Sequence, residues 1–437
     1  MLIPQGRGDN LAVTDRRHAT DSMDALTDAY PLQRRLERLR STAPGGQPRL
    51  QARSDHASEL ADTLAGLATD GIVSVTHDEH LPLERGALGL LPYSIDAGRP
   101  LVCLDLETTG LATAAGTLAF LVGIGIWDGD RLVVHQLLLP DHPDEPALLS
   151  QLADYLPPDA WLVTYNGRSF DWPLLVARYR MHRRDPPPLA GHLDLLPVAR
   201  QLWKHRTGDA RLTTIEADIC RVRRHDDLPG SLIPDRYFSY LRSRRGELLR
   251  DIVEHNRQDI VSLGRLLAVL ASTYASPSAW SAQHPGDLAG LARGYLRRRR
   301  PDEALGCVEA ALSAPAWADG VAGGAVLHRH LSAERARLLA RLGRRDESYA
   351  AWLEIAVHGG PGAALAWLHI ARHREHRLRD IDGALDACRQ AAAVAERARA
   401  WDRPMLHIER DLGRRFIRLR RRSLALRRFR TRACMAA

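Results

Sequence analysis

Two acidic residues, Asp105 and Glu107, stand two positions apart at the end of the apolar stretch 101–106. In a β-strand, side chains at positions i and i+2 point to the same face, so both carboxylates would emerge together from a buried strand. Burying two like charges side by side is costly, and a bound cation offsets that cost because carboxylate oxygens are preferred ligands of Mg²⁺ and Mn²⁺. The pair therefore predicts half of a metal site; the plainer alternative is a pair that only solubilises a strand edge.

Asp171 is the third acid of interest. It follows the apolar run 161–164 and the turn signal Asn166-Gly167, and it opens an amphipathic stretch. This pattern predicts a short strand, a turn, and then a helix that begins near Asp171. The plainer alternative for this acid is a helix cap.

His255 and Asp259 lie in a long helical pattern, 248–270, and their spacing of four places them on one helical face. An imidazole titrates near neutral pH and can take a proton from water, so His255 is a candidate general base. The alternative that the spacing leaves open is a residue on the helix surface, or one that orients Asp259.

These segments follow one another in the order Asp-x-Glu-Thr-Thr-Gly, Asn-x-x-x-Phe-Asp and His-x-x-x-Asp. The order resembles the three motifs of the DEDD superfamily of 3′ to 5′ exonucleases. Further segments resemble the bacterial YprB-like ribonuclease H-like family, namely 165–175, 192–196, 202–205 and 226–240. The resemblance covers about residues 98–272 and implies an α/β fold, with a ribonuclease H-like mixed sheet flanked by helices.

The resemblance also implies a chemistry. It points to a metal-dependent exonuclease that hydrolyses phosphodiester bonds of DNA or RNA, with two Mg²⁺ or Mn²⁺ ions held about 3.5–4 Å apart. The acids that match the motifs are Asp105, Glu107, Asp171 and Asp259. The match departs from the pattern at His255, because a spacing of four before Asp259 is typical of the tyrosine branch of the superfamily and not of the histidine branch.

Four polar residues are candidates for contact with a nucleic-acid substrate: Thr108, Thr109, Asn166 and Lys204. The two threonines follow the acid pair at the strand exit, and Lys204 could approach a phosphate. The alternative for the threonines and for Asn166 is an ordinary role in turns.

The charge of the chain is concentrated at one end. The net charge is +8, and residues 401–437 hold 12 arginines against three acids, a net of +9, which leaves −1 for residues 1–400. An arginine-rich tail could hold nucleic acid through counterion release. The alternatives are a solvated helix end with a disordered finish, or the binding of acidic protein or anionic lipid.

Composition limits the remaining classes. A chain of 437 residues with 45% hydrophobic residues is long enough for two or three domains. The five cysteines lack paired spacing, so neither a zinc site nor a disulfide framework is expected. The N-terminus lacks the apolar core of a signal peptide, and the longest apolar stretch, 118–127, is too short to span a bilayer. We therefore expect a cytoplasmic protein with no membrane partner.

The pattern divides the chain into regions. Residues 1–70 are polar and expected to be loosely ordered, with one helix over 24–39; residues 71–275 are expected to form the ribonuclease H-like domain. Within that domain, the Asp128-Gly129-Asp130 segment predicts a hairpin turn between two strands.

Helix pairs follow over residues 280–425, with a spacing near that of tetratricopeptide-like arrays, and the basic tail occupies 401–437. A plain helical bundle is the alternative. Stacked helix pairs present a concave surface, which favours a protein partner or a guide for the nucleic-acid strand. Two hypotheses thus remain: a metal-dependent 3′ to 5′ exonuclease, and a non-catalytic nucleic-acid-binding or scaffold protein.

Overall fold

The computed structural model describes residues 46–436, with the exception of Ser94, Ala97, 111–115, 225–226, 319 and 322. Contacts divide the chain into two units, Met1–Asp55 and His56–Ala437. Of the first unit, the described part is the beginning of helix α2 (Gly46–Leu64). The helix expected over 24–39 lies outside the described residues.

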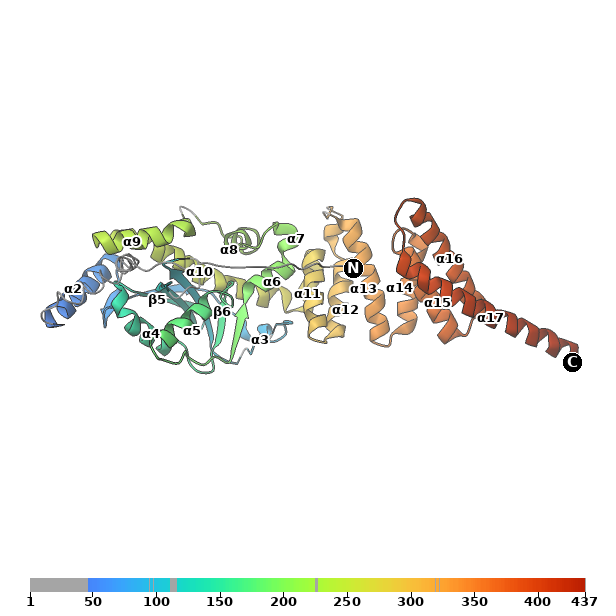
Figure 1. Cartoon of the computed structure of the whole chain (residues 1–437), viewed down its shortest axis with the longest axis horizontal. Coiled ribbons are helices and arrows are strands. Elements are labelled where there is room, and N and C mark those ends of the chain that lie inside the picture. The colour runs from blue at the N-terminus through green and yellow to red at the C-terminus, as the bar shows by residue number, and fades with distance from the viewer. Residues whose placement is uncertain are drawn as a thin grey trace, which may run out of the picture. The chain divides into compact units, whose positions relative to one another are not determined.

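A seven-stranded sheet lies in the N-terminal half of the second unit (Figure 1). The strand order is β1-β2-β5-β4-β3-β6-β7, in which β6 is parallel to both β3 and β7, and all other neighbours are antiparallel. The strands are β1 (Leu67–Thr69), β2 (Ile72–His80), β3 (Leu101–Thr108), β4 (Ala119–Asp128), β5 (Arg131–Leu138), β6 (Trp161–Thr164) and β7 (Gly191–Asp194). The predicted mixed sheet is confirmed, and so is the β4–β5 hairpin, whose Gly129 has a φ of +60°.

Alternate residues of β3 face two different hydrophobic cores. Val102 and Leu104 belong to the core that includes α4, α5 and α9, whereas Leu101 and Cys103 belong to the core that includes α6 and α10. Helices therefore flank both faces of the sheet. The helices of this part are α3 (Arg85–Leu88), α4 (Glu145–Asp154), α5 (Asp171–Met181), α6 (Leu195–Leu202), α7 (Lys204–Thr207), α8 (Leu212–Ile215), α9 (Ile233–Ser243) and α10 (Arg250–Val269).

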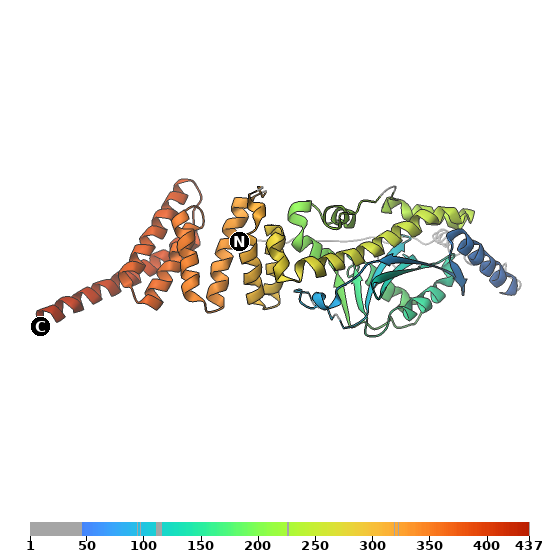
Figure 2. The same ribbon diagram turned by 180° about the vertical axis from the view of Figure 1, so that it is seen from behind.

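Helix α10 crosses the sheet at close range (Figure 2). Two glycines of β4 make this possible. A Cβ at Gly123 would lie 2.3 Å from Oδ1 of Asn256 and 2.8 Å from Ile260, and a Cβ at Gly125 would lie 2.7 Å from Ile260. Since these distances are far below contact distance, larger residues at these positions would displace α10.

After α10 the chain is helical. Consecutive helices pack on one another, so the predicted helix-rich C-terminal region is confirmed, while its likeness to tetratricopeptide arrays stays a prediction. The helices are α11 (Pro285–Arg297), α12 (Pro301–Leu312), α13 (Gly324–Arg341), α14 (Arg345–His358), α15 (Ala363–His373), α16 (Ile381–Ala400) and α17 (Leu406–Ala436).

Hydrogen bonds join α11 to the sheet-containing part. The π-helix η5 (Leu270–Tyr274) continues α10, and the Tyr274 hydroxyl donates a 2.8 Å hydrogen bond to Asp287 of α11. The amide of Gln201 on α6 donates a 2.7 Å hydrogen bond to the carbonyl of Gly290. Gly290 has no room for a Cβ, which would lie 2.3 Å from the Gln201 carbonyl oxygen.

The arginine-rich segment is helix α17, and part of its charge is neutralised within the protein. The fully buried carboxylate of Glu375 accepts hydrogen bonds from Arg415, Arg418 and Arg422, at 2.6, 2.7 and 3.2 Å respectively. Glu375 lies between α15 and α16, so these ion pairs hold α17 against the helices that precede it.

The stretch 46–69 differs from the expectation of loose order, since it contains α2 and β1. Ala57, Leu60 and Ala61 of α2 are buried in the core that also holds α9. The sequence did not indicate this helix, because most of its residues are polar and the buried residues Ala57, Leu60 and Ala61 are too few to give a clear helical periodicity. In the described part of the chain, every helix is too short or too polar to cross a membrane.

Candidate active site

Asp105 and Glu107 continue the face of β3 that Leu101 and Cys103 present to α10, because side chains alternate along a strand. The amide of Asn256, a buried residue of α10, donates a 3.0 Å hydrogen bond to Oδ2 of Asp105. Gln136 in turn donates a 2.9 Å hydrogen bond to Oδ1 of Asn256. One oxygen of Asp105 is thus fixed by a chain of buried amides.

Asp171 is the first residue of α5, directly after the loop that follows β6. Burial raises the pKa of its carboxyl, and the backbone of Leu106 on β3 lies close enough to act on that pKa, so Asp171 lies near the acid pair. Gly167 lies against it, since a Cβ there would be 2.8 Å from Oδ2 of Asp171. Asn166 adopts a left-handed φ of 67°, as its predicted place in a turn requires.

A buried carboxylate on the neighbouring strand holds the loop before Asp171. Oδ1 of Asp194 accepts hydrogen bonds from the backbone N–H of Asn166 at 2.8 Å and of Leu196 at 3.0 Å, and Oδ2 accepts one from Arg168 at 3.3 Å. Asp194 therefore shapes this loop.

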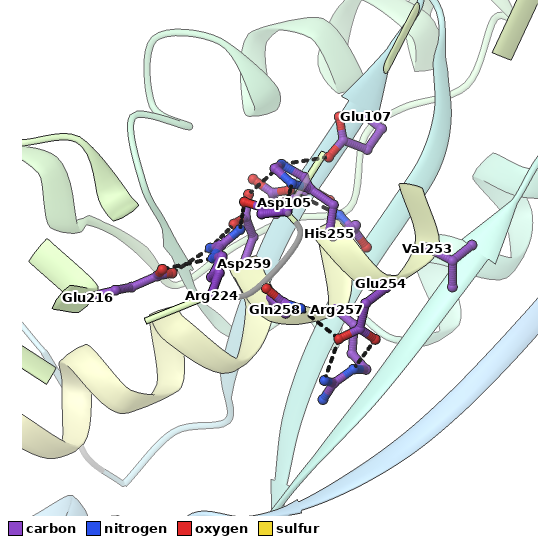
Figure 3. Close-up of polar contacts among 12 residues, drawn as sticks. Asp105, Glu107, Glu216, Arg224, Val253, Glu254, His255, Arg257, Gln258 and Asp259 are labelled. Carbon is purple, nitrogen blue, oxygen red and sulfur yellow. Dashed lines mark hydrogen bonds and ion pairs between the residues drawn. The ribbon is translucent and has the colours of Figure 1, made fainter. Parts of the chain in front are cut away.

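His255 and Asp259 reach the same place from α10 (Figure 3). Nε2 of His255 lies 3.7 Å from Oδ2 of Asp259 and 3.8 Å from Oε1 of Glu107. Its other ring nitrogen, Nδ1, lies 2.6 Å from Oδ1 of Asp227 and donates to it. The imidazole consequently presents Nε2 to the acids, with its orientation set by Asp227.

Arg224 is a further member of the cluster that the sequence analysis did not foresee. Its guanidinium pairs with Asp259 and with Glu216 of the π-helix η2 (Glu216–Cys220), and it lies 3.2 Å from Asp227. Glu216 is almost fully buried, and the Arg224 side chain is 7% exposed. Asp227 lies in a segment that carries the family resemblance, so a signal for it was present, whereas Arg224 and Glu216 stand in irregular sequence.

The four acids are coupled electrostatically. Burial raises the pKa of Asp105 well above its usual value, and the charges of Asp259, Glu107 and Asp171 raise it further. Burial, Asp259 and Asp171 do the same for the pKa of Glu107. Burial raises the pKa of Asp171 to about 7. Burial also raises the pKa of Asp259, against the opposing charges of Arg224 and His255. Asp105 and Glu107 thus respond to the charges of Asp171 and Asp259, as expected of groups in one site.

The donor set fits divalent cations. Six carboxyl groups meet one guanidinium and one imidazole, so the cluster carries excess negative charge when ionised. Ligand atoms of Glu107, His255 and Asp259 lie within 4.8 Å of one another. Buried carboxylate oxygens at such spacing are what Mg²⁺ and Mn²⁺ prefer.

The candidate substrate residues take different positions. The hydroxyl of Thr108 donates to the carbonyl of Gly110 at 2.7 Å, and the hydroxyl of Thr109 accepts from the N–H of Leu118 at 3.0 Å. Both threonines therefore have structural roles in the β3–β4 connection beside Glu107. Lys204 is exposed at the start of α7.

The residues after Lys204 contact the helical region. His205 lies 3.2 Å and Arg206 3.0 Å from the buried carboxylate of Asp287 on α11. This segment therefore joins the sheet-containing part to α11, and the structure does not bring Lys204 into contact with the four acids.

Comparison with known proteins agrees with this geometry. Residues 102–271 match the model of the RNase_H superfamily. The chain is also 29% identical, over 307 residues, to the uncharacterized protein YprB of Bacillus subtilis (strain 168). The aligned stretch covers 70% of this chain and 72% of the relative. Residues 102–271 are thus an RNase H superfamily domain with the expected ribonuclease H-like fold, and they contain every residue of the acid cluster.

Proposed function

We propose that this chain is a metal-dependent nuclease that removes nucleotides from the 3′ end of a nucleic-acid strand. The observation that carries the proposal is the convergence of four coupled carboxylates from β3, α5 and α10, all with raised pKa values. In the reaction, water attacks the terminal phosphodiester and the bond from phosphorus to O3′ breaks. A 5′-mononucleotide leaves, and the strand keeps a new 3′-hydroxyl.

The four acids would hold the metal ions. Asp105 and Glu107 extend from β3, Asp171 from the start of α5, and Asp259 from α10, so rigid elements fix each carboxylate. Two bound Mg²⁺ or Mn²⁺ ions would supply Lewis-acid stabilisation of the charge that develops on the phosphate.

His255 is assigned the role of general base. Because its Nδ1–H donates to Asp227, the lone pair of Nε2 points toward Glu107 and Asp259 and is free to take a proton from the attacking water. Asp227 then stabilises the imidazolium that forms.

Three further roles belong to the proposal. Thr108, Thr109 and Asn166 border the acids and are assigned contacts with the terminal nucleotide, through backbone and side-chain groups left over from their turn contacts. Lys204 is assigned a phosphate contact further along the strand. The helical region α11–α17 is assigned the binding of a protein partner or of the strand itself.

One observation favours the second hypothesis, a non-catalytic binding or scaffold protein. Arg224 pairs with Asp259, and so a guanidinium supplies part of the positive charge that metal ions would supply. If Arg224 alone balanced the cluster, the acids would serve stability and not catalysis.

A nuclease assay separates the two hypotheses. Purified full-length protein is incubated with 3′-labelled and 5′-labelled DNA and RNA, in Mg²⁺ or Mn²⁺ and in EDTA. The proposal expects metal-dependent release of mononucleotides, first from the 3′-labelled end. Asp105→Asn and Asp171→Asn should lower that release by at least about 10³-fold, since each removes a metal ligand.

Asp128→Asn is the matched control, because it makes the same chemical change at an exposed residue of the β4–β5 turn. It should leave the rate unchanged. Equal nucleotide release by the parent and by both site variants would rule out the catalytic assignment.

A further inference from the structure

A cavity of about 910 Å³ lies where β7 and α6 face α11. β7 is the last strand of the sheet, so the cavity borders an open sheet edge. It shares a wall with the acid cluster, because Arg168 and Asp194 line it and Asp194 holds the loop that leads to Asp171. The cavity has the size of a small-molecule or nucleotide site.

The lining is strongly basic. Five arginines contribute to it: Arg168, Arg200, Arg293, Arg297 and Arg298. Among the described residues of the lining, Asp194 is the one acid, and its two oxygens already accept three backbone hydrogen bonds. The lining therefore supplies no available carboxylate to Arg200, Arg293 and Arg297.

Arg293 shows most clearly that the positive charges of the lining act on one another. Its guanidinium has a 3.4 Å contact with the carbonyl of Gln201, and partial burial together with the neighbouring Arg297 lowers its pKa. Two arginines side by side without a carboxylate between them repel each other, and a bound anion would convert this repulsion into attraction.

Tyr93 also lines the cavity, as an aromatic residue beside the arginines. Trp161 completes the wall, its ring packed against Gly191, where a Cβ would lie 2.5 Å from the ring.

We propose that this cavity is a binding site for nucleotide phosphates. The planar guanidinium groups match phosphate oxygens in pairs, and Trp161 offers an aromatic surface for a base or sugar. The choice of nucleotide phosphate over another anion rests on the proposed nuclease function of the adjacent acids. Two sources share this chemistry: the backbone of the bound strand, and a released mononucleotide.

The test measures binding without cleavage. Full-length protein in EDTA is titrated against a labelled single-stranded oligonucleotide by fluorescence anisotropy at several salt concentrations, and against a 5′-mononucleotide by calorimetry. The variant Arg200→Gln/Arg293→Gln/Arg297→Gln should bind at least about 10-fold more weakly. For the oligonucleotide, the slope of log K against log salt should fall by about 2, since single strands lose about 0.7 per phosphate contact.

The matched control is Arg180→Gln/Arg242→Gln/Arg245→Gln, which makes the same charge change at exposed positions of α5, of α9 and of the segment after α9. It should bind as the parent does. A loss confined to the oligonucleotide identifies the strand as ligand, and a loss that includes the mononucleotide identifies the product.

Parent-like binding of both ligands by the cavity variant would overturn the inference, as would an equal loss in the control. Unfolding temperatures of all three proteins check that each is folded. Because EDTA removes metal ions and the acids are unchanged, failure here leaves the nuclease assignment standing, and failure of the nuclease assay leaves this binding result readable.

Discussion

At the scale of single residues, the orientation of His255 decides what the imidazole can do. Asp227 binds Nδ1 at 2.6 Å, which leaves Nε2 facing Glu107 and Asp259. A histidine held in this way combines a fixed tautomer with a nearby stabilising charge, whereas an unsupported histidine would rotate and exchange tautomers.

We predict that His255→Gln lowers kcat by about 10²- to 10⁴-fold, the usual contribution of a general base. Asp227→Asn should cost about 10- to 100-fold, because it removes the orienting charge and leaves the base in place. Single-turnover nucleotide release measures both. His330→Gln, at an exposed position of α13, is the control. A His255→Gln enzyme with the parent rate would show that another group accepts the proton.

The raised pKa of Asp171 predicts how stability depends on pH. Its pKa is about 7 in the folded chain, against an ordinary value of 3.8, so the folded state holds the proton to higher pH than the unfolded chain. The stability that this proton confers is complete below about pH 4 and is lost as the pH rises through about 7.

In EDTA, the unfolding temperature should therefore fall between pH 5 and pH 7.5, and Asp171→Asn should flatten that fall. Mg²⁺ or Mn²⁺ should raise the unfolding temperature more at pH 7.5 than at pH 5, because cations bind the deprotonated acids. Thermal denaturation with and without metal measures this. Identical profiles for parent and variant would contradict it.

Residue types and spacing led to the four acids and to His255, because their strand and helix periodicities place each on a definite face. The same reasoning could not find Arg224 and Glu216, which lie in a loop and a π-helix without a repeating pattern. The role of Asn256 could not be predicted for another reason. Its partner Asp105 is 151 positions away, and a single buried amide does not change the hydrophobic periodicity of a helix.

At the scale of elements, the position of α10 depends on the glycines of β4. We predict that Gly123→Val destabilises the protein by about 1–3 kcal/mol and lowers activity more than stability, because the new side chain would meet Asn256 and Ile260 and shift His255 and Asp259 with them. Denaturant unfolding and nucleotide release measure the two effects. Gly413→Ala on α17, where a Cβ meets nothing within 4 Å, is the control and should be neutral or stabilising.

A second element, α17, depends on Glu375. We predict that Glu375→Gln costs about 3–5 kcal/mol in the docking of α17, because it removes the buried carboxylate 2.6 Å from Arg415 and leaves that buried guanidinium with the more distant Asp411, at 3.7 Å. Faster proteolysis or hydrogen exchange in α17 would report the loss. Glu396→Gln, at an exposed position of α16, should leave protection unchanged. Equal protection of α17 in both variants would mean that apolar contacts alone hold it.

The elements themselves were largely predictable where one face is buried. Strands β3 to β6 follow from apolar runs bounded by turn residues, and the helix pairs follow from their spacing. The elements within residues 46–69 were not predictable. Helix α2 buries three side chains among charged neighbours, and β1 has three residues, so neither shows a hydrophobic periodicity strong enough to detect.

At the scale of the whole molecule, the arginines of α17 fall into two groups, those paired within the protein and those exposed to solvent. Some arginines of α17 serve Glu375, while Arg410, Arg414, Arg421 and Arg428 are exposed. Their spacing of four and seven residues aligns them along one side of the helix. The net charge of the tail therefore overstates what it offers to a partner.

We predict that changing these four exposed arginines to glutamine weakens nucleic-acid binding at low salt. The salt slope should flatten by about 2.8 to 3.6, because each of the four lost phosphate contacts removes about 0.7 to 0.9. Salt-dependent anisotropy measures this. The control changes Arg180, Arg242, Arg245 and Arg250 to glutamine, four exposed arginines outside the helices α11–α17. An unchanged slope would exclude α17 from the path of the strand.

Helix α10 and the π-helix η5 form one continuous helical segment. His255 and Asp259 lie near its beginning, and it ends at Tyr274, whose hydroxyl donates a hydrogen bond to Asp287 of α11. Inserting or deleting a single residue between Asp259 and Tyr274 would turn one end by about 100° relative to the other. Either His255 and Asp259 would then point away from the other acids, or Tyr274 would point away from Asp287. The number of residues in this interval is consequently under as strict a constraint as their identity, and lineages that vary the appended helices should still keep it fixed.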